Sequence, residues 1–440
     1  MKGWQLLRTI SRLLVTLFCS SAATGWQLLR TISRLLVGVL FIFSGYTKVV
    51  DPQGFAIKLN EYFVSLHIQF LEPLALTFAI LVIAAELTMG LCLIARLRMT
   101  ATAWAVLLFM SFFTLLTLFI AVNGDIVSDC GCFGDAIKLS NWATFLKNVA
   151  FMPFVLIIFF QRKKFQLVAT SFVEWGLLLA FFMCASGLGL YSNRHLPLID
   201  FMAYKVGVNI REDKSIPQGA ESDEYRTILI YEKDGVQQEF DDTNFPWQDT
   251  TWIYVETKEP VLIKKGYTPT IHDFSITSYE EGDITDIVLS NPSYTLILTS
   301  PKLAKANARN ISRINDLFAY CNRQENISFL AMTASSTEDI TGFINATNAG
   351  YPIHTADETT LKSMVRSNPG LMLIKDATIL AKWSEADIPT IEEVTKLLST
   401  SPDTIIRCYN NREFWSNFII IAILAISALF INFIKTTRKD

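Results

Sequence analysis

Long apolar stretches separated by short polar links fill most of the first 192 residues, and one more lies near the end of the chain. A membrane-spanning helix needs about 20 mostly apolar residues. Because backbone groups inside a bilayer must hydrogen-bond internally, we expect helices here. Buried core helices are the alternative, but five such stretches in succession argue against it. Six stretches are long enough to span a membrane: 28–49, 74–95, 100–122, 143–160, 171–191 and 414–434.

Lys and Arg residues gather near alternate ends of these stretches. The four clusters are Arg30 with Arg34, Arg96 with Arg98, residues 162–164, and residues 435–439. Loops on the cytoplasmic side carry an excess of Lys and Arg. All four clusters fall on that side if the chain starts inside. The pattern therefore predicts six spans with both termini in the cytoplasm and residues 193–412 outside.

The sequence GWQLLRTISRLLV occurs twice, at residues 3–15 and 25–37. We interpret this as a tandem duplication in which the second copy opens the first membrane helix. The alternative is a cleaved leader, because the first copy continues into TLFCSSAAT, which resembles the end of a signal peptide. We expect residues 1–24 to be an extension that membrane insertion does not need.

Composition agrees with a membrane protein. Hydrophobic residues make up 51 %, charged residues only 18 %, and the mean hydropathy is +0.34. Soluble domains carry about a quarter charged residues. The net charge of −3 indicates no nucleic-acid partner, and four scattered histidines indicate no metal site. The bilayer is the expected partner.

A Cys-Gly-Cys sequence, Cys130 to Cys132, lies in the predicted outer loop 123–142. Disulfides persist outside the cytoplasm. A disulfide across so short a ring is expected to be strained, and strained exposed disulfides are the oxidising ones. A membrane quinone or the thiols of another protein could reach the pair near the membrane surface. The alternatives are a structural disulfide or two unpaired thiols in a turn.

Three stretches resemble the MauE branch of the DoxX-like membrane proteins. They are RTISRLLVGVLFIFSGYTKVVDPQGFAIKLNEY (30–62), AAELTMGLCLIARLR (84–98) and DCGCFGDAIKLSNWATFLKN (129–148). The resemblance implies a four-helix membrane domain in a bacterial inner membrane. It also implies a role in disulfide formation or in maturation of a periplasmic enzyme, a role associated with methylamine utilisation. The whole layout resembles a longer DoxX-family type from Bacteroidetes that carries an outer domain.

The family motif falls on Ser44, Gly45 and Lys48, with Glu86 as the acid inside the membrane. An ionisable group in a membrane helix is a functional hypothesis by default. Glu86 is therefore either a proton relay for thiol or quinone chemistry or a neutral, hydrogen-bonded packing group. We interpret Cys92 and Cys184 as small buried residues.

Residues 193–412 form the predicted periplasmic part. In 193–265 we expect a small β-rich region with a hairpin around Lys233-Asp234-Gly235. In 266–400, predicted strands at 294–298, 327–332, 371–374 and 378–383 alternate with helices at 303–323, 338–348, 358–366 and 391–398. This order resembles the thioredoxin fold, with Pro369 as a cis proline before the third strand.

The predicted thioredoxin-like domain lacks the cysteines of its family. The stretch where they would stand is Thr299-Ser300-Pro301-Lys302-Leu303-Ala304. Without a thiolate nucleophile the usual dithiol chemistry is excluded. Cys321 lies late in the following helix and is a poor substitute. We therefore expect this domain to bind a partner in the cell envelope.

The predicted fold is a membrane helical bundle with a periplasmic α/β thioredoxin-like domain. We divide the chain into residues 1–24, 25–165, 166–192, 193–265, 266–400 and 401–440. Two functions remain open. One is an envelope thiol–disulfide or quinone-linked redox protein that uses Cys130, Cys132 and Glu86. The other is a membrane anchor or assembly factor without enzymatic activity.

Overall fold

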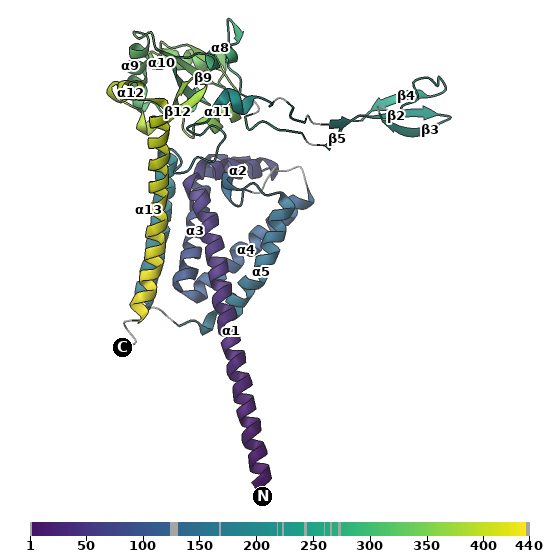
Figure 1. Cartoon of the computed structure of the whole chain (residues 1–440), viewed down its shortest axis with the longest axis vertical. Coiled ribbons are helices and arrows are strands. Elements are labelled where there is room, and N and C mark those ends of the chain that lie inside the picture. Colours follow the sequence, from purple (N-terminus) through teal and green to yellow (C-terminus); the bar gives the residue numbers. More distant parts are fainter. Residues whose placement is uncertain are drawn as a thin grey trace.

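The computed structural model describes residues 2–123, 131–166, 169–217, 219–221, 224–241, 244–258, 260–264, 266–271 and 274–436. Figure 1 shows a helical bundle, an α/β domain over one end of the bundle, and a β-rich arm that extends sideways between them. The prediction of a membrane helical part joined to a thioredoxin-like domain is confirmed.

The bundle contains α1 (Lys2–Val50), α2 (Pro52–Ser65), α3 (Ala75–Ala95), α4 (Met99–Val122), α5 (Asn141–Phe160) and α6 (Ser171–Arg194). Five segments are long and apolar enough to cross a membrane: Gly25–Val50, Gln69–Ala95, Met99–Val122, Asn141–Phe160 and Ser171–Arg194. They coincide with the first five predicted spans, and the chain is a multi-pass membrane protein.

The sixth predicted stretch lies within one long helix, α13 (Pro402–Thr436), which runs alongside the bundle in Figure 1. Asn417 of this helix accepts a 2.6 Å hydrogen bond from the Tyr46 hydroxyl of α1. Its amide nitrogen donates to the carbonyl of Leu198 at 3.0 Å. The first contact ties α13 to the bundle, and the second ties it to the segment that follows α6.

Helix α1 is far longer than a membrane is thick. Its 49 residues, at about 1.5 Å per residue, span about 74 Å, whereas the hydrocarbon core is about 30 Å thick. The candidate span begins at Gly25, within the second copy of the repeat. The first half of α1 projects beyond the bundle in Figure 1.

Glycines bring α1 and α3 into close contact. A Cβ atom on Gly45 would lie 2.9 Å from the backbone nitrogen of Leu87, and one on Gly90 would lie 2.7 Å from that of Ile42. No side chain fits at such distances. Small residues of this kind let membrane helices approach closely.

Basic residues from separate clusters meet at the end of the bundle away from the α/β domain. The Arg34 guanidinium donates to the carbonyl of Ile94 at 2.6 Å, near the end of α3. Arg30 donates to the carbonyl of Lys164 at 3.3 Å. Arg30, Arg96 and Lys164 line one pocket at this end of the bundle. Cations are favourable beside the carbonyls that end a helix. The α/β domain lies at the opposite end of the bundle (Figure 1).

The segment between α1 and α3, residues 51–74, is largely helical. It contains helix α2 and a 3-10 turn, η1 (Gln69–Leu74). The Asp51 carboxylate caps α2 by accepting from the backbone N–H of Gly54 at 3.0 Å, and Pro52 occupies the first turn. Both are typical of a helix start. Helix α2 lies across the end of the bundle, below the α/β domain (Figure 1).

The α/β domain has a seven-stranded sheet in the order β12-β11-β8-β9-β10-β6-β7. Its strands are β6 (Thr277–Ser278), β7 (Gly282–Asp283), β8 (Tyr294–Ser300), β9 (Ile327–Thr333), β10 (Ile353–Thr355), β11 (Gly370–Lys375) and β12 (Thr378–Trp383). Strands β8 and β9 are parallel, while β11 is antiparallel to both β8 and β12. This arrangement, with a cis peptide bond at Asn368–Pro369, is the thioredoxin-like fold that the sequence predicts.

Helices of the α/β domain cover both faces of the sheet and bury two cores. They are α7 (Ile210–Lys214), α8 (Thr285–Leu289), α9 (Ile311–Cys321), α10 (Thr337–Thr347), α11 (Glu358–Met364) and α12 (Ile391–Leu398). Tyr204, Val206 and Ile210 pack into one of these cores. Part of the predicted β-rich region therefore packs as a piece of the α/β domain.

The prediction of one helix over residues 303–323 is wrong for the residues before 311. Two 3-10 turns, η4 (Leu303–Lys305) and η5 (Ala308–Asn310), precede α9, which begins at Ile311. The Asn307 side chain caps η5 by accepting from the N–H of Arg309. The Asn310 side chain donates to the carbonyl of Glu385. Such Asn side chains favour caps and turns over helix interiors. Strands β6, β7 and β10, of two or three residues each, were not predicted.

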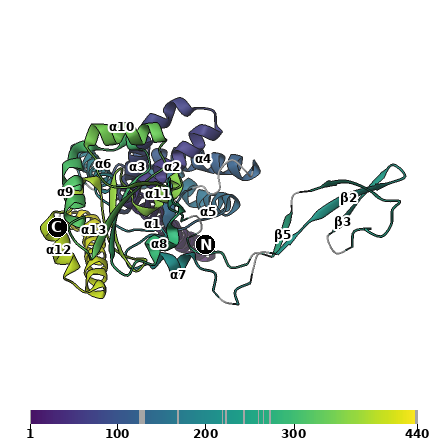
Figure 2. The same cartoon turned by 90° about the horizontal axis from the view of Figure 1, so that it is seen from above.

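The arm consists of short antiparallel strands. Strand β2 (Ile228–Lys233) pairs with β3 (Val236–Asp241) and β4 (Ile253–Thr257), and β1 (Glu224–Arg226) pairs with β5 (Val261–Lys264). Asp234 and Gly235, both at positive φ, form the hairpin turn, so the predicted hairpin is confirmed. Figure 2 shows the arm well away from the rest of the chain.

Candidate functional site

Gly131 and Cys132 of the Cys-Gly-Cys sequence lie at the end of the bundle that faces the α/β domain. Cys130 lies outside the described residues. Cys132 is half-buried in a tight turn that the N–H of Gly134 closes by donating to the carbonyl of Gly131 at 3.0 Å. Both glycines have positive φ, +62° and +56°, where L side chains are strained. We call Gly131–Gly134 the cysteine turn.

The cysteine turn is packed on α1, α2 and α5. The Ser44 hydroxyl donates to the carbonyl of Cys132 at 2.6 Å. A Cβ on Gly131 would lie 3.2 Å from the Lys58 side chain of α2. Phe133 is buried, with its ring 5.4 Å from that of Phe43 and the Lys147 ammonium 4.3 Å from its centroid. These contacts fix the backbone on which Cys132 is carried.

A buried polar chain continues from the turn into the membrane. Lys48 Nζ donates to Ser44 Oγ at 3.1 Å and lies 2.8 Å from Glu86 Oε2. The side chains of Lys48 and Glu86 are each 6 % exposed. Ser44 and Lys48, one turn apart on α1, therefore meet Glu86 of α3, 38 residues further along the chain, in one network below Cys132. Glu86 has a cationic partner that sequence reasoning did not identify.

Lysines surround the cysteine turn on three sides: Lys48 on α1, Lys58 on α2 and Lys147 on α5. Lys58 is paired with Glu61 at 3.1 Å and Lys48 with Glu86. The cations of Lys48 and Lys58 are therefore each balanced by a carboxylate beside the cysteine turn.

The other described cysteines are separate from the turn. Cys92 is buried on α3, as predicted. Cys184 is exposed, so the prediction that it is buried is wrong. Cys408 is also exposed.

The site of the thioredoxin-like domain where cysteines are expected is closed by hydrogen bonds. The Ser300 hydroxyl, at the end of β8, donates to Asn368 Oδ1 at 2.6 Å. The Asn368 amide donates to the carbonyl of Lys302 at 2.8 Å. Burial raises the pKa of Cys321 to about 11, which suppresses its thiolate. No described residue at the end of β8 offers a redox-active sulfur.

Sequence reasoning missed three charged residues at the boundary between the bundle and the α/β domain: Asp51, Asp135 and Arg366. The Arg366 side chain reaches both carboxylates. Asp135 directly follows Cys-Gly-Cys-Phe-Gly, and the sequence Asp51-Pro52 is a helix-start signal. Each therefore carried a local signal, but no local pattern indicates that Arg366 would meet them.

Comparisons with known proteins agree with this layout. Residues 26–161 match the family model described as "Methylamine utilisation protein MauE", which confirms the predicted resemblance. Residues 225–265, in the arm, match a "Domain of unknown function (DUF8463)". The protein TlpB of Flavobacterium psychrophilum is 28 % identical over 143 residues, which cover 32 % of this chain and 39 % of TlpB. The chain thus spans less than half the length of this relative.

Among solved structures, the chain resembles a thiol-disulfide oxidoreductase from Bacteroides fragilis. The match is 11 % identical, covers 28 % of this chain and 96 % of that one, and has a TM-score of 0.25. A thioredoxin-like protein from Aeropyrum pernix matches with 13 % identity, 29 % and 89 % coverage, and a TM-score of 0.24.

Proposed function

We propose that this protein exchanges disulfides on the outer side of the bacterial inner membrane, with Cys130 and Cys132 as the exchanging pair. One observation carries the proposal: Cys132 sits on a rigid turn directly above a buried network of Ser44, Lys48 and Glu86. An ionisable residue inside a membrane helix is a functional-site hypothesis by default, because burying it there is costly. The match of residues 26–161 to the MauE model supports the same conclusion.

The proposed reaction starts from a disulfide between Cys130 and Cys132. A thiolate of an envelope protein attacks one of the two sulfurs, the bond between them breaks, and the other sulfur leaves as a thiolate. A second thiolate of the envelope protein then displaces the first cysteine from the mixed disulfide. The envelope protein has lost two electrons and gained a disulfide, while Cys130 and Cys132 are reduced.

Reoxidation of the pair needs a two-electron acceptor. We propose a membrane quinone, which takes two electrons and two protons from the two thiols and becomes a quinol. Ser44, Lys48 and Glu86 form a continuous polar path from the turn into the bundle. One of the two protons would pass along this path to Glu86 and from Glu86 to the quinone, so that Glu86 ends the cycle as it began.

The redox state of the pair in cells tests the proposal. A thiol-reactive mass tag counts free thiols in the native chain and in the variant Cys130→Ser/Cys132→Ser. In aerobic cells we expect the same count for both, because the pair is oxidised in the native chain. After reduction the native chain should gain two tags and lose them again when the reductant is removed. Loss of this recovery in membranes depleted of quinone would identify the acceptor. Fully reduced thiols that resist mild oxidants would overturn the proposal.

A second function is favoured by the thioredoxin-like domain. Its site at Ser300 and Asn368 is closed and holds no thiol, although its fold is complete. If the cysteine pair proves inert, we propose that the protein is a membrane anchor that presents this domain to an envelope partner. Exchange of the pair with a substrate distinguishes the two functions, because the anchor does not require it.

A further inference from the structure

One arginine of the α/β domain is buried against the membrane domain. Arg366 lies between α11 and the cis peptide bond at Asn368–Pro369. Its Nε lies 3.0 Å from Asp51 Oδ2, and its Nη2 lies 3.0 Å from Asp135 Oδ2. The side chain is only 8 % exposed. Helix α11 faces α2 across this boundary in Figure 1.

The three charges are held by further contacts. The other Asp51 oxygen caps α2, and Arg366 Nη1 donates to the carbonyl of Lys362 at 3.1 Å. Burial alone lowers the pKa of Arg366, but Asp51 and Asp135 outweigh it and raise the pKa above its usual value. The guanidinium is therefore charged at every working pH.

Only glycine at position 54 leaves room for these three charged side chains. A Cβ on Gly54 would lie 2.6 Å from Asp135 Oδ2, 2.9 Å from Asp51 Oδ2 and 3.3 Å from Arg366 Nη2. Only glycine lets the three side chains meet over the first turn of α2. The contact is thus built into both domains.

Asp135 directly follows the cysteine turn. The ion pair between Arg366 and Asp135 therefore holds the end of the turn that carries Cys132. The turn is held from the bundle side by the bond from Ser44 to the carbonyl of Cys132. It is held from the α/β side by the pair between Arg366 and Asp135. A turn fixed on both sides presents its half-buried sulfur in one orientation.

We propose that Arg366 is a positioning residue for Cys132, and that docking of the α/β domain through Arg366 limits the access of outside reagents to that sulfur. The chemistry of Cys132 rests on the function proposed above. The docking itself does not, and it can be tested on a chain that cannot form the disulfide.

The test uses the full chain with Cys130→Ser, purified in lipid nanodiscs. The rate at which a small maleimide modifies Cys132 is measured by mass spectrometry of its peptide. We expect Arg366→Ala and Asp135→Asn each to raise the rate at least about tenfold, the factor that ~1.4 kcal/mol produces. Because both remove the same contact, their effects should not add. Arg366→Lys, which keeps the charge but not the fork-shaped geometry, should fall between them and the parent.

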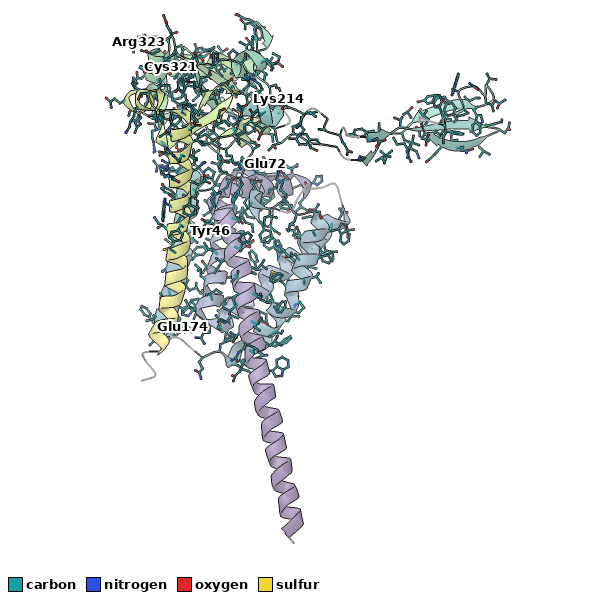
Figure 3. All side chains as sticks on the ribbon, viewed as in Figure 1. Tyr46, Glu72, Glu174, Lys214, Cys321 and Arg323 are labelled. Carbon is teal, nitrogen blue, oxygen red and sulfur yellow. The ribbon has the colours of Figure 1, made fainter. Side chains whose placement is uncertain are left out.

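Two controls separate this effect from unfolding. Arg323→Ala changes an arginine on the side of the α/β domain away from the bundle (Figure 3) and should leave the Cys132 rate unchanged. Cys321 is buried in the core of the α/β domain, so its slow modification reports that the domain is folded. If Arg366→Ala exposes Cys321, Asp135→Asn decides the test, because it changes only the membrane domain.

An unchanged Cys132 rate in the folded Arg366 and Asp135 variants would overturn the proposal. This outcome is independent of the redox test. A pair that stays reduced in cells, together with faster modification of Cys132 in Arg366→Ala, would refute disulfide exchange but keep the docking role. A redox-active pair with unchanged modification rates of Cys132 would keep disulfide exchange but refute the docking role.

Discussion

The substitution Glu86→Gln should destabilise the membrane domain strongly. It removes the negative charge beside Lys48 but keeps the size of the side chain. At 2.8 Å, two unit charges attract by about 6 kcal/mol in a medium of effective dielectric constant about 20. The cost of burying both charges offsets part of this attraction. Removing one partner of a buried pair typically costs ~3–5 kcal/mol, because the other charge stays buried and unpaired.

A matched control is available in the same domain. Glu61 pairs with Lys58 on α2, but its side chain is 38 % exposed, compared with 6 % for Glu86. Pairs three or four residues apart on a helix contribute about 0.2–0.5 kcal/mol. Glu61→Gln should therefore change the free energy of unfolding by no more than this.

The assay is unfolding of the purified chain by a denaturing detergent, followed by the circular dichroism of its helices. We expect Glu86→Gln to lose about 3 kcal/mol of unfolding free energy. The double variant Lys48→Met/Glu86→Leu should recover most of the loss, since apolar groups of similar volume can replace a buried ion pair. Equal effects of Glu86→Gln and Glu61→Gln would refute the assignment of a buried pair. So would a double variant less stable than Glu86→Gln.

Four further predictions follow from the fold. Gly45→Val should destabilise the bundle by more than about 2 kcal/mol, because its side chain would meet the α3 backbone; Gly187→Val, with nothing within 4 Å, should be nearly neutral in the same assay. A chain that starts at Gly25 should insert into membranes as the full chain does, and failure would show that the first copy of the repeat is a leader. Insulin reduction by the purified full chain in which Cys130 and Cys132 are Ser should match buffer; activity that Cys321→Ser abolishes would contradict the closed site. Tyr279→Cys, at a residue 96 % exposed on the α/β domain, should react with a membrane-impermeant maleimide in intact spheroplasts, and reaction only after lysis would reverse the topology.

Local patterns in the sequence identified most of the elements. Apolar runs of about 20 residues located five spans to within a few residues, because a bilayer imposes both length and composition on a helix. Strand β12 and helix α12 were predicted at their observed bounds, since a short apolar run and a Thr390 cap are local signals. The start of α9 was missed because side-chain contacts of Asn307 and Asn310 override the helical pattern.

The sequence by itself determined that the chain crosses a membrane, which residues could do chemistry, and that the thioredoxin-like domain lacks thiols at its usual site. It could not determine which of those residues meet. Lys48 and Glu86 are 38 residues apart, and Arg366 is 315 residues from Asp51. Periodicity and spacing report only on neighbours within one helix or strand. Contacts between elements depend on how closely α1 and α3 pack and on where the α/β domain sits, and only the tertiary structure fixes both.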